Sequence, residues 1–197
     1  MNHTDNRRPR GRPRSFDPDQ AVAIAQRLFH ARGFDAVSVA ELTAALNINP
    51  PSFYAAFGSK AELYARILDR YAMVGAIPLR ELLATHPGVA EGVAAVLEEA
   101  ARRYAADPAA AGCLVIEGAR CVDPGARNAA CGFLAAAEDA LRRHIATAHP
   151  DEADRLTDFV CTVMAGMSAN ARNGHDVERL LATARLAAAA LGEALRA

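Results

Sequence analysis

The sequence predicts an all-α fold, and three observations support this prediction. Apolar residues make up 52% of the 197 residues, alanine and leucine dominate among them, and aromatic residues account for only 6%. This composition favours helices, because β-branched and aromatic side chains are the ones that prefer strands. Helix-capping patterns recur in the first third of the chain, and no segment has a convincing strand pattern. We therefore expect an N-terminal three-helix domain followed by a larger helical domain.

The first helix is expected to begin after a polar arm. Residues 1–15 are rich in arginine and proline and show no hydrophobic periodicity, which is typical of a flexible basic arm. Asp17 is a favourable N-cap, and Pro18 fits the first helical position, where its missing N–H group has no intrahelical partner. Gly33 marks the end of this helix.

Two short helices joined by a tight turn are expected next. Ser38 and Glu41 have the spacing of a capping box and open a helix over residues 39–46. Asn49 is placed to cap a helix over residues 50–57, whose two leading prolines are tolerated in a first turn. A longer helix followed by two such helices matches the helix-turn-helix pattern, in which the second short helix enters the DNA major groove. The spacing alone leaves an ordinary helical hairpin as the alternative.

The remainder of the chain is also expected to be helical. Ser59 with Glu62 forms a further capping box and starts a helix that ends near residue 74. Proline, glycine and asparagine separate the apolar segments that follow. We expect these later helices at residues 89–106, 108–121, 125–147, 151–173 and 176–196.

The segment from Gly33 to Leu63 resembles the DNA-binding domain of the TetR family, the tetracycline-repressor-like regulators of bacteria. The family pattern is matched without gaps at Gly33, Phe34, Ser38, Leu42, Leu46, Ile48, Phe53, Tyr54, Phe57, Ser59, Lys60 and Leu63. It departs at Asn47, where the family has glycine, and at Asn49, where it has serine. The resemblance covers about residues 15–72. It implies a homodimeric, ligand-responsive repressor that binds a palindromic double-stranded DNA operator and is released by a small-molecule effector.

The resemblance places the DNA contacts on the helix-turn-helix. Tyr54 and Lys60 would contact phosphates, and Lys60, the single lysine of the chain, would do so at a helix N-terminus. Base edges would meet the leading end of the recognition helix, where two prolines favour apolar contact with thymine methyl groups and readout of DNA shape. The expected contact residues are Thr43, Asn49, Pro50, Pro51, Ser52, Tyr54 and Lys60. The aromatic and aliphatic side chains expected in the core are Phe29, Leu42, Phe53 and Phe57.

The arm resembles the core of an AT-hook. Arginines on an extended backbone fit the narrow minor groove of A·T-rich DNA, which implies contacts from Arg10, Arg12 and Arg14. The alternative is a solubilising tail that touches phosphates without sequence preference. Residues 1–70 hold ten Arg or Lys and seven Asp or Glu, whereas the rest of the chain holds twelve and sixteen. A basic end on an acidic body suits a protein that docks one end on a polyanion.

Several classes of protein are excluded by what the sequence lacks. No apolar stretch resembles a signal peptide, and none approaches the roughly 18 residues of a membrane span. We therefore expect a cytoplasmic protein with reduced cysteines and no membrane contact. No nucleophile elbow, P-loop, dinucleotide-binding fingerprint or zinc-protease motif is present, so we expect neither an enzyme nor a cofactor. The four cysteines form no C-x-x-C pair, which argues against a preformed metal site.

The chain is expected to divide into the arm (1–15), a DNA-binding domain (16–61) and a ligand-binding and dimerisation domain (62–197). In the last helix apolar residues repeat every seven positions, which is typical of a helix–helix seam. Together with the preceding helix it would form half of an intersubunit four-helix bundle, and burial within one subunit is the alternative. The expected interface residues are Val163, Met167, Val177, Leu181, Ala184, Ala188, Leu191 and Leu195.

An effector pocket is expected among the helices between residues 60 and 170. For each candidate residue the alternative is plain core packing. The competing hypothesis for the signal itself is a copper- or redox-responsive regulator that senses through its cysteines. The candidate pocket residues are Tyr104, Cys113, Ile116, Cys121, Phe133, His144, Phe159, Met164 and Asn170.

Overall fold

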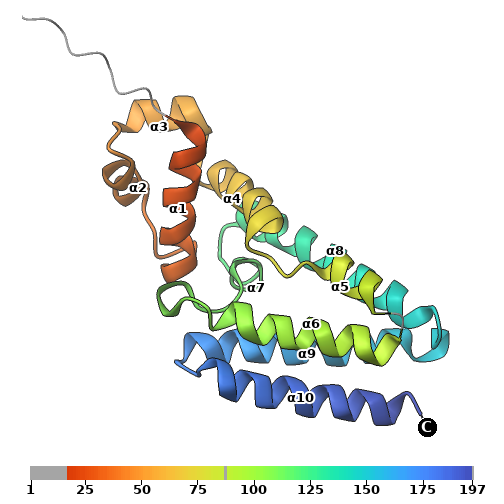
Figure 1. The fold of residues 1–197 in the computed structure, drawn as a ribbon. Helices are drawn as coiled ribbons and strands as arrows, with labels where there is room; N and C mark the ends of the chain where they lie inside the picture. The colour runs from red at the N-terminus through yellow and green to blue at the C-terminus, as the bar shows by residue number, and fades with distance from the viewer. Residues whose placement is uncertain (1–16, 87, 197) are drawn as a thin grey trace, which may run out of the picture.

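The structure, a computed structural model, describes residues 17–86 and 88–196. Every regular element over these residues is helical, which confirms the predicted all-α class (Figure 1). The first six helices are α1 (Pro18–Arg32), α2 (Val39–Leu46), α3 (Pro50–Phe57), α4 (Lys60–Val74), α5 (Leu79–Thr85) and α6 (Val89–Tyr104). They are followed by the 3-10 turn η1 (Pro108–Ala110), α7 (Leu114–Gly118), α8 (Pro124–Ala146), the 3-10 turn η2 (Pro150–Glu152), α9 (Ala153–Arg172) and α10 (Val177–Ala194).

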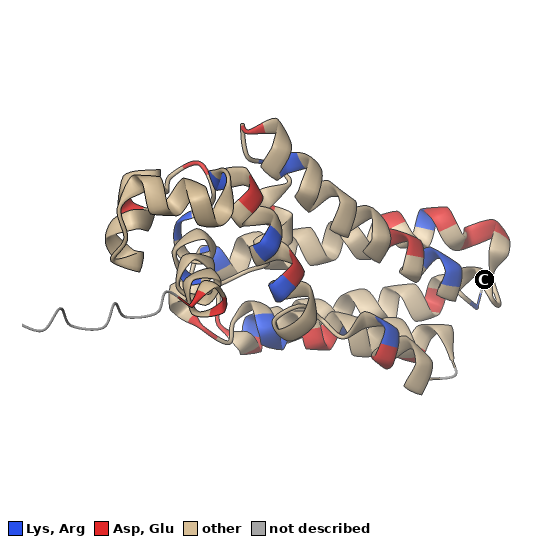
Figure 2. Ribbon diagram, turned by 90° about the horizontal axis from the view of Figure 1, so that it is seen from above, with Lys and Arg blue, Asp and Glu red and all other residues tan. Residues whose placement is uncertain are grey.

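The three N-terminal helices lie at one end of the molecule, and α10 runs along the opposite side (Figure 1). Helix α10 packs on α6 and α9, while α8 packs on α4, α7 and α9. Charged residues gather at the far end, where α8 ends and α9 begins (Figure 2). Helix α4 joins the two parts of the molecule, because it packs on α1 and α3 and also on α8.

The boundaries of α1 follow from its capping residues. The Asp17 carboxylate accepts hydrogen bonds from the backbone N–H groups of Asp19 at 3.0 Å and Gln20 at 3.4 Å. At the other end Gly33 has a φ of 79°, a conformation that favours glycine, and its N–H donates to the Phe29 carbonyl. Both boundaries are those predicted.

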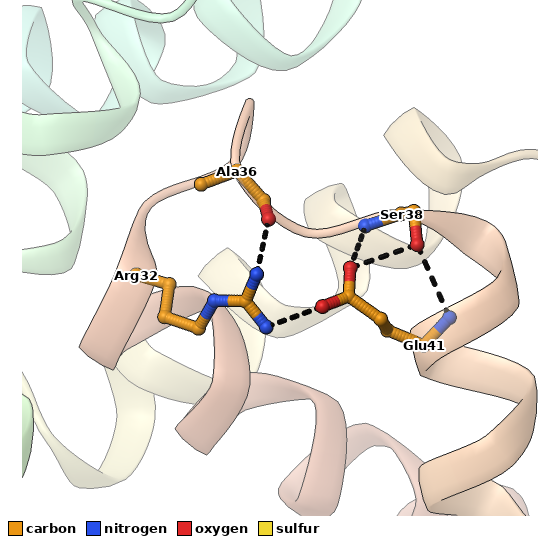
Figure 3. A network of polar contacts seen from close by, with 4 residues as sticks. All are labelled: Arg32, Ala36, Ser38 and Glu41. Carbon is orange, nitrogen blue, oxygen red and sulfur yellow. Dashed lines mark hydrogen bonds and ion pairs between the residues drawn. The ribbon is translucent and has the colours of Figure 1, made fainter.

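The capping box predicted at α2 is present, and it also ties α2 to α1 (Figure 3). The Ser38 hydroxyl accepts from the Glu41 N–H at 3.2 Å, and the Glu41 carboxylate accepts from the Ser38 N–H at 2.8 Å. Arg32, at the end of α1, donates to the same carboxylate at 2.6 Å and to the Ala36 carbonyl at 2.7 Å. The bonds from Ser38 and from the Arg32 guanidinium lower the pKa of Glu41 to about 2.

A left-handed residue and a side-chain cap shape the turn between α2 and α3. Asn47 has a φ of 52° and a ψ of 46°, and its N–H donates to carbonyls in the last turn of α2. Asparagine visits this region more readily than other residues with a side chain, which explains its place at the turn. The Asn49 side chain accepts from the Ser52 N–H at 2.8 Å and so caps α3, as predicted.

Three predicted helical features differ in the structure. The Ser59 hydroxyl caps α4 and donates to the Glu62 carboxylate at 3.1 Å, but the reciprocal backbone bond of a capping box does not form between these described residues. Helix α5 is absent from the predicted set, because prolines flank a segment of only seven residues. In place of a helix over 108–121 the chain forms η1 and α7, because Gly112 interrupts it with a φ of 80°. The other helices agree to within two residues at each end.

Two buried cores hold the helices together. The first packs α1, α2, α3 and α4 around fully buried side chains and extends to α7 and the first turns of α8. It includes the predicted core residues Phe29, Leu42, Phe53 and Phe57, all fully buried, which confirms that prediction. The second lies between α5, α6, α9, α10 and the far part of α8, and Cys113 packs against both. The domain boundary at residue 61 stays a prediction, and the first core runs across it.

Candidate DNA interface and effector cavity

The first turn of α3 forms the exposed end of the helix-turn-helix. The predicted base-edge residues Asn49, Pro50, Pro51 and Ser52 are all exposed, whereas Phe53 behind them is fully buried. The side-chain oxygen of Asn49 accepts the hydrogen bond of the helix cap, so the N–H groups of its side-chain amide remain for an external partner. This end therefore presents two apolar proline rings beside two short polar side chains.

Tyr54 and Lys60 lie on consecutive helices, α3 and α4. Tyr54 on α3 is 53% exposed, and its ring packs edge-on against Phe53 with centroids 5.4 Å apart. Lys60 is the first residue of α4, and its Nζ lies 4.0 Å from the centroid of the Phe34 ring. Partial burial lowers the pKa of Lys60, and the nearby carboxylate of Asp35 opposes this shift. An aromatic neighbour thus positions each of the two side chains.

Thr43 and the arm arginines complete the predicted contact set. Thr43 is only 6% exposed, and its hydroxyl donates to the Ala40 carbonyl at 2.9 Å. Helix α2 therefore already uses the proton that a phosphate would accept, which makes Thr43 the least accessible member of the described set. Arg10, Arg12 and Arg14 lie outside the described residues. Their contacts stay predictions.

An apolar cavity of about 320 Å³ opens between α4, α6, α7, α8 and α9. Five of the predicted pocket residues line it, namely Tyr104, Cys113, Ile116, Phe133 and Met164. Lining residues that the sequence did not single out include Tyr71, Arg120, Ala137, Glu138 and Cys161. Helical periodicity alone does not identify them, because it does not say which face of α4 or α8 meets the other helices.

Four predicted pocket residues do not line this cavity. Cys121 is buried in the first core, where its thiol donates to the Asp123 carbonyl at 3.6 Å. The ring of His144 lies against Gly92 of α6. Phe159 is 38% exposed on α9. The fourth, Asn170, is in the last turn of α9, beyond the cavity.

Two tyrosines and a cysteine form a polar group in the apolar cavity wall. The Tyr71 hydroxyl donates to the Cys113 Sγ at 3.8 Å, and Tyr104 lines the cavity beside this thiol. Burial raises the pKa of Tyr71, of Tyr104 and of Cys113, because each charged form would be poorly solvated. All three groups are therefore neutral at physiological pH.

The cysteines do not favour the copper- or redox-responsive alternative. Burial raises the pKa of Cys113, Cys121 and Cys161, which keeps these thiols protonated. The thiolate is the form that binds metals and reacts with oxidants, so a raised pKa lowers both tendencies. Within residues 17–86 and 88–196, no three His, Cys, Asp or Glu residues gather closely enough to hold a metal ion.

Residues 111–114, which run from the end of η1 to the first residue of α7, connect the cavity to α1. Arg172 of α9 donates to the Ala111 carbonyl at 3.2 Å and to the His30 carbonyl, near the end of α1, at 3.1 Å. The His30 ring nitrogen Nε2 hydrogen-bonds to the Gly112 carbonyl at 3.1 Å. Burial lowers the pKa of His30, and the contact with the Gly112 carbonyl opposes this shift. The end of α1 is therefore attached to this segment by two contacts.

The same segment is bonded to α4 and α9. The Cys113 N–H donates to the Ser168 Oγ at 2.9 Å, and the Tyr64 hydroxyl donates to the Leu114 carbonyl at 3.2 Å. A side chain at Gly112 would meet the Ser168 carbonyl oxygen at 2.9 Å, so glycine is required here for its space as well as its φ. Sequence reasoning missed this junction, because its partners come from distant helices and only Gly112 marks it.

Part of the predicted dimer seam is buried inside the subunit, which corrects that prediction. Met167, Ala184 and Leu191 are at most 1% exposed and pack in the second core. Helix α10 places its apolar stripe on α6, and a seven-residue repeat does not distinguish a neighbouring helix of the same chain from a second copy. The half-buried members of the set are Val163, Leu181, Ala188 and Leu195. Val177 is 38% exposed.

Helices α9 and α10 also carry apolar side chains on their outer faces. Phe159 on α9 is 38% exposed, and Leu186 on α10 is 73% exposed. The exposed small residues near them on these helices are Thr162, Gly166, Ala182, Ala189 and Ala190. Among the helices of the described residues, none combines the length and the apolar character that crossing a bilayer requires.

A helix-turn-helix with an exposed recognition helix, followed by helices that enclose an apolar cavity, defines a DNA-binding transcription regulator rather than an enzyme. The chain belongs to the TetR family: the sequence profile of the bacterial regulatory proteins, tetR family, matches residues 22–67. The HTH-type transcriptional repressor BdcR of Escherichia coli (strain K12) is 52% identical over 186 residues, which cover 94% of this chain and 92% of that protein.

Two further relatives extend the comparison. The HTH-type transcriptional repressor ComR of Escherichia coli (strain K12) is 29% identical and covers 89% of each chain. A cysteine mutant of the TetR family transcriptional regulator CifR has been solved in complex with 26bp double-strand operator DNA. It is 34% identical to this chain, has a TM-score of 0.82, and the match covers 91% of this chain and 99% of that one.

Proposed function

We propose that the protein represses transcription in the cytoplasm as a homodimer that holds a palindromic operator and releases it when a small molecule enters the cavity. The observation that best supports this proposal is the 52% identity to BdcR, a repressor by name, over nearly all of both chains. The CifR complex adds a protein of the same fold bound to operator DNA.

We assign operator contact to α3 and the start of α4. The first turn of α3 meets base edges, where the rings of Pro50 and Pro51 pack against thymine methyl groups. Tyr54 and Lys60 contact the flanking phosphates, which set the register of the helix without reading sequence. The exposure of Tyr54 and the position of Lys60 at a helix N-terminus support these roles.

Two copies associate through the outer faces of α9 and α10. The stripe that contains Ala184 and Leu191 is occupied by α6, so the interface centres instead on Phe159 and Leu186, which are apolar and exposed. The small residues around them allow helices to approach closely. A two-fold dimer of this kind sets its recognition helices about 34–36 Å apart, the spacing of successive major grooves.

Helix α4 and residues 111–114 transmit the signal. An effector in the cavity contacts Tyr71 of α4 and Cys113, and both are bonded into the junction with α1. A shift of either changes the position of the helix-turn-helix. Only a ligand that binds the two arrangements with different affinities acts in this way, and a coupling of about 1–3 kcal/mol is typical.

A gel shift with the DNA upstream of the protein's own gene tests this proposal. We expect a retarded complex at roughly nanomolar dimer concentrations that resists competition by unrelated DNA of the same length and base composition. Equal binding to both DNA fragments would contradict the proposal.

A further inference from the structure

The rim of the cavity carries charge, although its interior does not. The charged lining residues are Arg120, just beyond α7, and Glu138 on α8, and both are exposed. Glu138 also borders a second hollow, of about 380 Å³, between α8 and α9. The same carboxylate therefore lies where the apolar cavity and this second hollow meet.

The second hollow, here called the acidic groove, has an excess of negative charge. Its charged lining residues are Glu138, Asp139, Arg142, Asp154 and Asp158. Arg142 is engaged by Asp139, with an N–O distance of 2.5 Å, and its Nε lies 4.0 Å from Asp154. Over the described residues, Glu138 and Asp158 have no basic partner. The groove lies within the charged end of α8 and α9 seen in Figure 2.

The negative charge of the groove acts on the cavity wall. Cys161 lines the cavity, and its pKa is raised to about 11, first by burial and then by the charges of Glu138 and Asp158. These two exposed carboxylates therefore lie close enough to a cavity-lining group to oppose its ionisation. A cation at this side of the cavity is stabilised by the same field, and an anion is destabilised.

We propose that the effector is an amphiphilic organic amine, with its apolar body in the cavity and its ammonium group at Glu138, where the acidic groove begins. This inference rests on the proposed function and names the ligand class for the same site. The apolar lining suits an apolar body, and the neutral phenols of Tyr71 and Tyr104 offer it no ionic partner. Among the described lining residues, Arg120 is the one basic group, and it would favour an anionic head group. The preference of the cavity for a cationic or an anionic head group therefore tests the proposal.

Three probes that share one apolar body test the proposal: 4-phenylbutylamine, 4-phenylbutan-1-ol and 4-phenylbutyrate. Their binding to the DNA-free protein is measured by isothermal titration calorimetry. We expect the amine to bind about tenfold more tightly than the alcohol, because a charge-assisted contact is worth about that factor, and the carboxylate to bind most weakly. The substitution Glu138→Gln is expected to remove the preference for the amine and to leave the affinity for the alcohol unchanged.

Two further variants locate the bound amine. Asp151→Asn removes an exposed carboxylate on η2 that lines neither hollow, and it is expected to leave the binding of all three probes unchanged. Ala137→Phe fills the cavity and is expected to abolish binding of all three, and Ala137→Leu replaces it if the larger side chain prevents folding.

Several results overturn the proposal. The first is that the alcohol or the carboxylate binds as tightly as the amine or more tightly, and the second is that no probe binds. The third is that the preference for the amine survives Glu138→Gln. The fourth is that the amine still binds when the cavity is filled. Because calorimetry is done without DNA, each of these leaves the repressor proposal standing. The repressor proposal is tested independently by the gel shift, and it is overturned if the ligand-free protein does not prefer its own upstream DNA to unrelated DNA.

Discussion

At the scale of single residues, the helix-turn-helix separates side chains that build the turn from side chains that face outwards. Asn47 and Asn49 shape the backbone between α2 and α3, and both effects follow from local chemistry that a sequence displays. The position of Lys60 over the Phe34 ring does not follow from local chemistry, because it depends on how α4 packs against α1. The residue types at the predicted interface were therefore readable in advance, and their orientation was not.

Removing Lys60 tests the phosphate contacts directly. Lys60→Ala should weaken binding to all DNA sequences about equally and reduce the log–log salt slope by about one per subunit, because one fewer phosphate is neutralised. Tyr54→Ala should weaken binding with little change of slope, since a phenol carries no charge. Fluorescence anisotropy at several salt concentrations measures both, with Arg80→Ala, an exposed arginine on α5, as the control. An unchanged slope with an altered base preference would show that the role of Lys60 is misassigned.

The Arg32–Glu41 network predicts a pH dependence of stability. The pKa of Glu41 is about 2 in the folded protein, below the ordinary value of 4.5. The carboxylate therefore contributes to the stability of the folded state above pH 4.5, and this contribution is lost as the pH falls towards 2. Glu41→Gln should therefore lower the thermal unfolding midpoint at neutral pH, and the difference from the wild type should shrink between about pH 5 and 2. Circular dichroism melts measure this, and a difference independent of pH would contradict it.

At the scale of helices, the sequence predicts an element well where a cap marks its start. The boundaries of α1, α2 and α3 follow from side chains within three residues of the helix, whereas the segment over 108–121 depends on Gly112 and on contacts with α9. The faces of helices were harder to predict than their lengths. The repeat in α10 indicated a partner helix correctly, but most of its stripe packs on α6 of the same chain.

A double-mutant cycle tests whether residues 111–114 carry the signal. Ala137→Phe fills the cavity as an effector would and should weaken operator binding about tenfold, which corresponds to a typical coupling. Arg172→Gln removes the bonds from α9 to Ala111 and to α1, so in its background the same filling should weaken operator binding less than about threefold. Operator affinities from anisotropy supply the cycle, and Arg179→Gln, exposed on α10, is the control. Additive effects would mean that the signal bypasses this segment.

At the scale of the whole molecule, the two cores meet at Cys113 and along α8, which contributes side chains to both. The DNA-binding end and the α6–α9–α10 bundle share Cys113 and are bridged by α4. This arrangement allows a change in the cavity to reach α3 without unfolding either core. The class of fold and the existence of a cavity were predictable from the sequence, because both follow from helical periodicity and from the family pattern. The site of subunit contact was not, since exposure depends on which helices fill each face.

The subunit contact is tested with two leucines of α10. Leu186→Glu places a charge on the exposed apolar face and should give a folded monomer that binds the operator poorly. Leu191→Glu places it in the second core, where Leu191 is 1% exposed, and should unfold the chain. Light scattering and circular dichroism distinguish these outcomes. A Leu186→Glu variant that stays dimeric would exclude this face as the interface.

The central claim, a two-fold dimer that reads DNA with α3, is tested most directly by footprinting the wild-type protein across its own chromosome. We predict protected sites with two-fold symmetry, whose half-sites are centred about 10–10.5 base pairs apart or at a multiple of this spacing, because the two recognition helices enter successive major grooves on one side of the duplex. One such site should lie upstream of a gene whose transcription rises when the protein is removed. Protection without symmetry, or no protected site at all, would contradict the account.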